Sequence, residues 1–125
     1  MNKTAIIILS DPQNGGEEAL GRLFNGFATA YDIKQSDGEV SILFQGTGTR
    51  WIGYITKEDH PLNGLYELVK EDIVGVSSGC ADFFGAADDA KTCGIELITE
   101  NLIPGTSGLP SIGKLLSSDS TVLTF

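Results

Sequence analysis

The sequence has few of the residues from which metal sites, redox centres and nucleic-acid interfaces are built. It contains one histidine and two cysteines, and its 8 lysines and arginines are outnumbered by 17 aspartates and glutamates. The resulting net charge of −9 would repel phosphate backbones and anionic lipid, so we expect neither nucleic acid nor a membrane as a partner. A single histidine and two separated cysteines offer no ligand cluster, so we expect no metal and no other cofactor.

Long apolar runs are also missing. No stretch approaches the roughly twenty apolar residues of a membrane-spanning helix. The first apolar run, residues 5–9, is shorter than the apolar core of a signal peptide. Cys80 and Cys93 match neither a CxxC redox pair nor a disulfide framework, which is typical of a reducing compartment. We therefore expect a cytoplasmic protein with reduced cysteines.

What the sequence does contain is a series of short apolar runs that predict strands. Four runs are clear and a fifth is weaker: residues 5–9, 40–44, 73–76, 121–125 and, less strongly, 95–98. These runs do not alternate with polar residues, which indicates strands covered on both faces, as in parallel sheets beneath helices.

Helical patterns fill the intervals between these runs. Apolar residues recur three or four apart over residues 20–31, and Pro61 suits the first position of a second helix. A third helix is expected from Cys80 to the glycine at position 94, and a fourth near Pro110. Alternating strands and helices over 125 residues predict one domain, residues 1–125. The fold class is α/β, a three-layer sandwich with a mostly parallel five-stranded sheet and helices on both faces.

The loops that follow the carboxyl ends of such strands line the ligand crevice, and they are rich in glycine and serine. They supply the candidate pocket residues Asp11, Gly46, Gly48, Ser78 and Gly79. Backbone N–H groups of such loops can face an anion. For Asp11, capping of the following helix is favoured over ligand contact. For Gly46 and Gly48, tight turns are favoured over phosphate binding, because a tryptophan breaks the GxGxxG pattern at position 51.

Cys80 is the sharpest candidate for chemistry. With Gly79 as the cap, Cys80 would be the first residue of the third helix, beside unpaired N–H groups that favour a thiolate. Its helical spacing to Phe83 is equally compatible with a buried apolar stripe, so the residues alone leave a reactive and a buried thiol open. We interpret Cys93 as a packing residue and His60 as a turn residue.

In their order along the chain, these segments resemble the DsrE/DsrF-like family of small sulfur-relay proteins, which includes the YchN-like proteins. The resemblance spans nearly the whole chain. It rests on the opening strand with its long helix, the Val-Ser-Ile-Leu-Phe strand at 40–44 leading into Gly-Thr-Gly-Thr-Arg-Trp at 46–51, Cys80 after the third strand, and Gly-Leu-Pro-Ser-Ile-Gly at 108–113 before the closing strand. The resemblance implies a five-stranded parallel sheet between helices and a homo-oligomer, commonly a trimer or hexamer. It also implies that Cys80 accepts sulfur as a persulfide and passes it on.

Two functions follow as hypotheses. The first is a sulfur-relay protein, a sulfurtransferase that exchanges sulfur with donor and acceptor proteins at Cys80. The second is a noncatalytic oligomeric protein whose glycine loops bind a small ligand or an anion while Cys80 is buried. A flavodoxin-like electron carrier would share the architecture, but no loop has a flavin phosphate signature.

Overall fold

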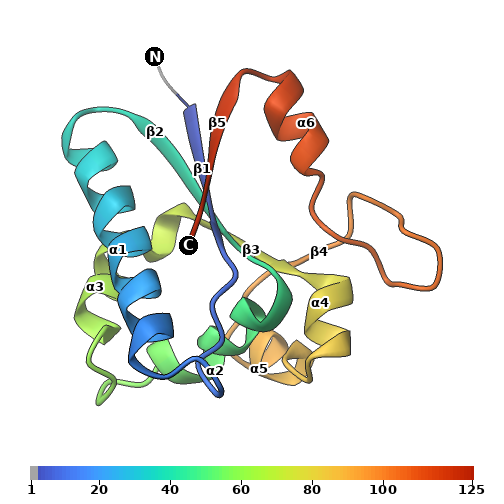
Figure 1. The fold of residues 1–125 in the computed structure, drawn as a ribbon, viewed down its shortest axis with the longest axis horizontal. Coiled ribbons are helices and arrows are strands. Elements are labelled where there is room, and N and C mark those ends of the chain that lie inside the picture. Colours follow the sequence, from blue (N-terminus) through green and yellow to red (C-terminus); the bar gives the residue numbers. More distant parts are fainter. Residues whose placement is uncertain (1–2) are drawn as a thin grey trace.

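A five-stranded parallel sheet forms the centre of the molecule in the computed structural model, which describes residues 3–125 (Figure 1). The strands are β1 (Lys3–Ile8), β2 (Glu39–Phe44), β3 (Ile73–Ser77), β4 (Leu97–Ile98) and β5 (Ser120–Thr124). Their order in the sheet is β4-β3-β2-β1-β5, and each of the four neighbouring pairs is parallel. The predicted α/β class and five-stranded sheet are confirmed.

Helices and short 3-10 turns connect the strands, because parallel neighbours need crossover connections. They are α1 (Gly16–Gln35), the 3-10 turn η1 (Gly46–Trp51), α2 (Ile52–Ile55), α3 (Asn63–Val69), the 3-10 turn η2 (Lys70–Asp72), α4 (Ser78–Phe83), α5 (Ala87–Thr92) and α6 (Ile112–Ser117). The helix predicted from the apolar stripe at 20–31 is α1, which buries Leu23, Phe27 and Ala30 as that stripe requires. Within residues 3–125, no helix combines the length and the apolar character needed to cross a bilayer.

The main core lies on one face of the sheet, under α1. Ile6 and Ile8 of β1 lie on this face together with Phe44 of β2, because side chains alternate along a strand. Phe27 of α1 meets Phe44 edge to face, with ring centroids 6.2 Å apart. Helices α2, α3 and α5 add their buried side chains to the same cluster. Each large side chain buried in this way contributes about 1.5–3 kcal/mol.

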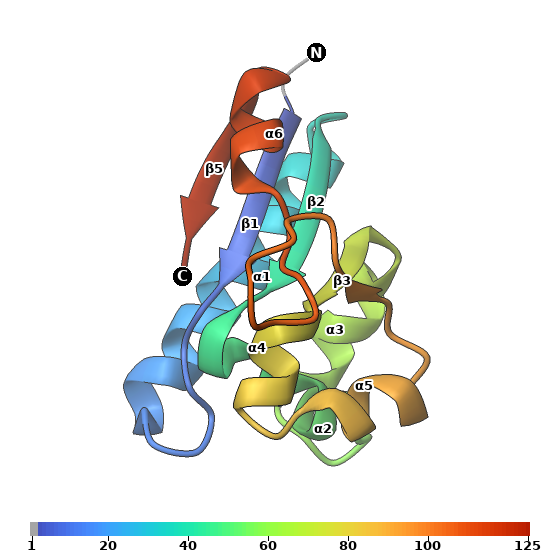
Figure 2. The ribbon, with the colours of Figure 1, turned by 90° about the vertical axis from the view of Figure 1, so that its right-hand side faces the viewer.

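A smaller cluster covers the opposite face. Ile7, Leu43 and Ile98 are buried there, and Ile112 and Leu115 of α6 pack against them. Figure 2 shows α6 in front of the sheet and α1 behind it. The molecule is therefore a three-layer sandwich in which one face carries most of the helices and the other is covered by α6.

The sequence prediction is wrong for the third helix, which is two helices instead of one. Gly85 adopts a left-handed conformation, with φ of 72°, between the end of α4 and the start of α5. Because glycine reaches this region without strain, it ends a helix readily. Pro61 also differs from prediction, since it lies in a turn and α3 begins at Asn63.

The segment after β2, expected to be a loop, forms η1 and continues directly into α2. Trp51 at its end is only 3% exposed and lies in the main core. The Trp51 indole N–H donates to the Ser10 hydroxyl at 3.2 Å. Gly48 packs so tightly against β1 that a Cβ atom there would overlap the carbonyl oxygen of Ile8.

This close approach predicts that Gly48→Ala lowers the free energy of unfolding by about 1–3 kcal/mol, because the added methyl group meets backbone that cannot rotate away. The matched control is Gly21→Ala in α1, where a Cβ meets no atom within 4 Å. That change should raise stability by up to about 1 kcal/mol through helix propensity. Urea unfolding of both variants measures the difference, and equal effects would contradict the packing argument.

Candidate functional site

The carboxyl edge of the sheet brings together the loops that follow β1, β2 and β3. From β1 the chain passes through α1, on one face of the sheet, to β2 and onward to β4. It then returns through α6, on the other face, to β5 on the opposite side of β1, so the strand order reverses between β1 and β5. In open α/β sheets, ligand crevices lie at the carboxyl ends of strands next to such a change. Helix α4, which carries Cys80, packs against η1 at this edge.

Asp11 is held in this region by three donors. Its carboxylate accepts from the Gln13 amide at 2.9 Å, from Asn14 Nδ2 at 2.9 Å and from Arg50 Nη1 at 3.1 Å. Burial raises the pKa of Asp11, but these hydrogen bonds and the charge of Arg50 outweigh it and lower the pKa below its ordinary value. The expected capping role is wrong, because α1 begins after Gly15 with no side-chain cap.

Arg50 is fixed on three sides. Its Nη1 atom pairs with Asp11, its Nε atom donates to the carbonyl of Phe84 at 3.2 Å, and its guanidinium lies 5.5 Å from the centroid of the Phe84 ring. An arginine held in this way loses little further freedom when it forms another hydrogen bond. Arg50 thus ties the loop after β1 to the segment between α4 and α5.

Cys80 is partly exposed, and its thiol is free. The helix cap is Ser77, not Gly79, so Cys80 is the third residue of α4 and not the first. The Cys80 N–H donates to the Ser77 hydroxyl at 3.3 Å, and the Gly79 N–H donates to the carbonyl of Gly108 at 2.7 Å. The expectation of unpaired N–H groups beside the sulfur is therefore wrong for these two amides.

A loop that sequence reasoning did not connect with Cys80 lies against α4. Residues 101–109, which we call the arm, project from the fold in Figure 1 as the orange loop and are closed by an antiparallel bridge between Asn101 and Leu109. The Ser107 hydroxyl donates to Asp82 at 2.7 Å, and the same oxygen lies 2.7 Å from the Ser78 hydroxyl. Because Ser107 has one proton to give, Ser78 is the donor to Ser107. This chain of hydroxyls fastens the arm to the first turn of α4.

The glycines after β2 have a structural role. Gly46 has a left-handed φ of 57° where the chain enters η1, and Thr49 Oγ1 donates back to its carbonyl at 2.8 Å. Gly48 is buried against β1. The turn interpretation therefore holds for Gly46, whereas Gly48 has no positive φ and is required by its close approach to β1. Ser78 and Gly79 lie in the first turn of α4 and are hydrogen-bonded to Ser107 and Gly108 of the arm. Their predicted place beside the candidate site is therefore combined with a contact to the arm.

The second cysteine and the histidine lie elsewhere. Cys93 is exposed at the end of α5, with its sulfur 3.6 Å from Thr56 Oγ1, so its assignment as a packing residue is wrong. His60 fits its assignment to a turn, because its Nδ1 atom accepts from the Leu62 amide at 3.1 Å. Burial lowers the pKa of His60 in spite of the nearby charge of Asp59, which favours the neutral ring.

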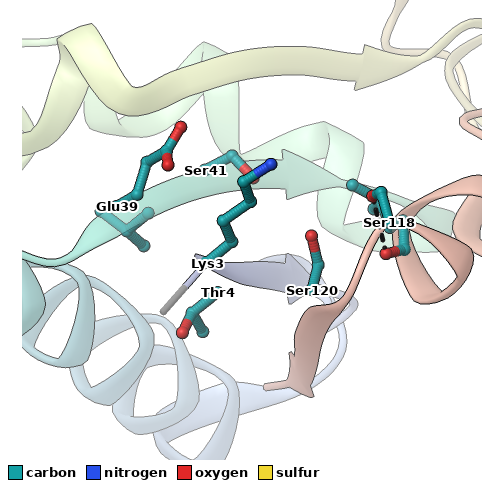
Figure 3. Close-up of a pocket in the computed structure, with 8 residues that line it drawn as sticks. Lys3, Thr4, Glu39, Ser41, Ser118 and Ser120 are labelled. Carbon is teal, nitrogen blue, oxygen red and sulfur yellow. Dashed lines mark hydrogen bonds between the residues drawn. The ribbon is translucent and has the colours of Figure 1, made fainter. Parts of the chain in front are cut away.

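Two hollows in the surface were not foreseen from the sequence. One, of about 230 Å³, lies at the amino ends of β1, β2 and β5, and Figure 3 shows the Lys3 side chain extending across it toward Ser41. Its lining includes Glu39, Ser118 and Ser120. The other, of about 250 Å³, lies at the carboxyl edge and is lined by Gln13, Arg50, Gly53, Tyr54, Lys57, Gly85, Ala86 and Asp89. Of these two, the second lies at the carboxyl ends of the strands, which is where ligand crevices form in open α/β sheets.

The lowered pKa of Asp11 makes part of the stability dependent on acid. A carboxyl group whose pKa is lowered by folding stabilises the folded state. This stabilisation is fully present above the ordinary pKa of 3.8 and is lost as the pH falls through the lower pKa of the folded protein. We expect Asp11→Asn to cost about 1 kcal/mol near neutral pH. The difference in free energy of unfolding between this variant and the unchanged protein should then shrink below about pH 4. Urea unfolding of both proteins across this pH range measures the difference. A difference that stays constant below about pH 4 would contradict a lowered pKa of Asp11 in the folded protein.

Comparisons with known proteins support the fold and name no activity. No protein-family model matches the chain. The chain is 34% identical over 62 residues to an uncharacterized protein, MJ0733, of Methanocaldococcus jannaschii, and it spans about half the length of that curated relative (50% of each protein). Among solved structures it resembles BT1422, a conserved protein of unknown function from Bacteroides thetaiotaomicron, with a TM-score of 0.63 and 15% identity over 97% of this chain and 94% of that one. At this identity the likeness shows a shared fold alone, and the resemblance to the DsrE/DsrF-like family stays a prediction.

Proposed function

We propose that the protein is a sulfur-relay protein that takes up sulfur as a persulfide on Cys80 and hands it to an acceptor thiol. The observation that carries the proposal is the partly exposed, unpaired Cys80 thiol at the carboxyl edge of the sheet. A carrier needs one accessible nucleophilic sulfur and a surface on which partners dock, and it needs no metal or organic cofactor.

The chemistry requires no net oxidation. The Cys80 thiolate attacks the outer sulfur of a donor persulfide, a sulfur–sulfur bond forms at Cys80, and the donor leaves as a thiolate while the proton stays on the transferred sulfur. In the second step an acceptor thiolate attacks that outer sulfur and releases the Cys80 thiolate. Each step is one thiol exchange in which the bond that breaks and the bond that forms are of the same kind.

The surroundings of Cys80 support a fixed position for the thiol. Ser77 caps α4 through the Cys80 amide, and the Ser78–Ser107–Asp82 chain holds the arm against the same turn. Asp82 is the negative charge nearest in sequence to Cys80, and its carboxylate accepts a hydrogen bond from Ser107. Donors to a carboxylate spread its charge, which reduces the repulsion that a neighbouring thiolate would meet.

The two cysteines allow a matched test. After incubation with a low-molecular-weight persulfide, the Cys93→Ser protein should gain the mass of one sulfur atom and the Cys80→Ser protein should not. A reducing agent should remove the gain, and cyanide should convert it to thiocyanate. The relay proposal fails if the gain is absent from Cys93→Ser, or if it appears only on Cys93.

Native-state alkylation separates the relay from the noncatalytic alternative. If Cys80 serves as a carrier, a neutral alkylating reagent labels it in the folded protein, within the same range of rates as the exposed Cys93. Labelling of Cys80 that begins only after denaturation would favour a binding protein with a sealed cysteine.

We also propose that the chain forms a homo-oligomer, a trimer or hexamer. Large apolar side chains remain exposed, above all Phe83 at 83% and Leu102 at 77%. Phe83 lies on α4, which carries Cys80, and Leu102 lies on the arm that is hydrogen-bonded to α4. Large exposed apolar side chains are typical of interaction surfaces when they form one patch. Size-exclusion chromatography with light scattering should give three or six times the chain mass, and Phe83→Ser should lower it. A monomer at all concentrations would contradict the proposal.

A further inference from the structure

The hollow between α2 and α5 carries charges of both signs. Lys57 and Asp89 line it, and neither makes an ion pair within residues 3–125, where the ion pairs involve Arg22, Lys34, Arg50 and Lys70. Oppositely charged groups that border one hollow without meeting leave a gap between them. That gap is suited to a ligand that itself carries two opposite charges.

Arg50 adds a prepared hydrogen-bond donor to this lining. Its Nε and Nη1 atoms are bound to Phe84 and Asp11, while its Nη2 atom has no hydrogen-bond partner within the described chain. Because Asp11 already neutralises Arg50, the remaining charges of the hollow are one cation, Lys57, and one anion, Asp89. The lining is therefore close to neutral as a whole and strongly dipolar.

Two glycines line the hollow. A Cβ atom on Gly53 would overlap the Asp89 carboxylate, so the absence of a side chain at position 53 lets that carboxylate lie against α2. Gly85 also lines the hollow, and no atom lies within 4 Å of the place where its side chain would begin. The Tyr54 ring borders the same space. With about 250 Å³, the hollow falls below the usual range of pockets for drug-sized ligands and fits a smaller molecule.

We propose that this hollow binds a small neutral α-amino acid. The carboxylate of the ligand lies toward Arg50 Nη2 and Lys57, and its ammonium group lies toward Asp89. A plain anion is disfavoured, because the protein carries a net charge of −9 and the lining offers no net positive charge. A zwitterion has no net charge to be repelled and satisfies both unpaired groups. The inference does not depend on sulfur transfer at Cys80.

The test titrates the full chain with L-alanine, L-serine, L-valine and L-methionine and follows the amide signals by NMR. At least one should bind saturably and shift the amides of Gly53, Lys57, Gly85 and Asp89. Two fragments of alanine serve as ligand controls: propionate has only the negative charge, and ethylamine has only the positive one. Each fragment should bind about tenfold more weakly than alanine, because it leaves one charged group of the hollow unpaired.

Variants separate this site from general surface binding. Asp89→Asn and Lys57→Gln should each weaken binding on the order of tenfold. Asp88→Asn, an equal loss of charge on the neighbouring exposed residue of α5, should leave binding unchanged. The proposal is overturned if none of the four amino acids saturates, if either fragment binds as tightly as the amino acid, or if Asp88→Asn matches Asp89→Asn. If Asp89→Asn fails to fold, Lys57→Gln decides, because Lys57 is exposed.

Discussion

The contact on which the carboxyl edge depends is the approach of Gly48 to the last residue of β1. The Gln45 amide still donates to the carbonyl of Ile8 at 3.0 Å, and Gly48 then passes directly over that carbonyl. Only a residue without a side chain can come so close to backbone. The approach fixes the path of η1, and through it the positions of Arg50 and Trp51. The ion pair at Asp11 and the start of α2 follow from these positions.

Much of the fold could be predicted because it is encoded in local patterns. The β1 and β2 runs are mostly apolar stretches, and their observed ends lie within two residues of the predicted ones. The α1 stripe has strong helical periodicity, although the helix extends beyond residues 20–31 at both ends. The apolar spacing of Phe83, Phe84 and Ala87 continued across a real break, so the pattern concealed the division between α4 and α5. Gly85 was the signal of that break. Ser77 was likewise a better cap than Gly79, since serine is preferred at that position.

The candidate site was less predictable, because its contacts join residues far apart in the chain. Cys80 could be singled out from its place after β3, but nothing in the sequence indicated that Ser107 and Gly108 would contact α4. The hollow between α2 and α5 depends on where α5 begins, which is set by the break at Gly85. Residues 84–86 therefore separate α4, which carries Cys80, from α5, which borders the hollow. Both sites depend on the conformation of this segment.

The two edges of the sheet are unequal. The edge strand on one side is β4, which is only two residues long, so it offers too few free backbone groups to pair with a further strand. At the other end, β5 is five residues long and has β1 as its neighbour on one side only. Open edges are where sheets recruit additional strands. Lateral growth of this sheet, whether by orderly assembly or by aggregation, is consequently directional and begins at β5.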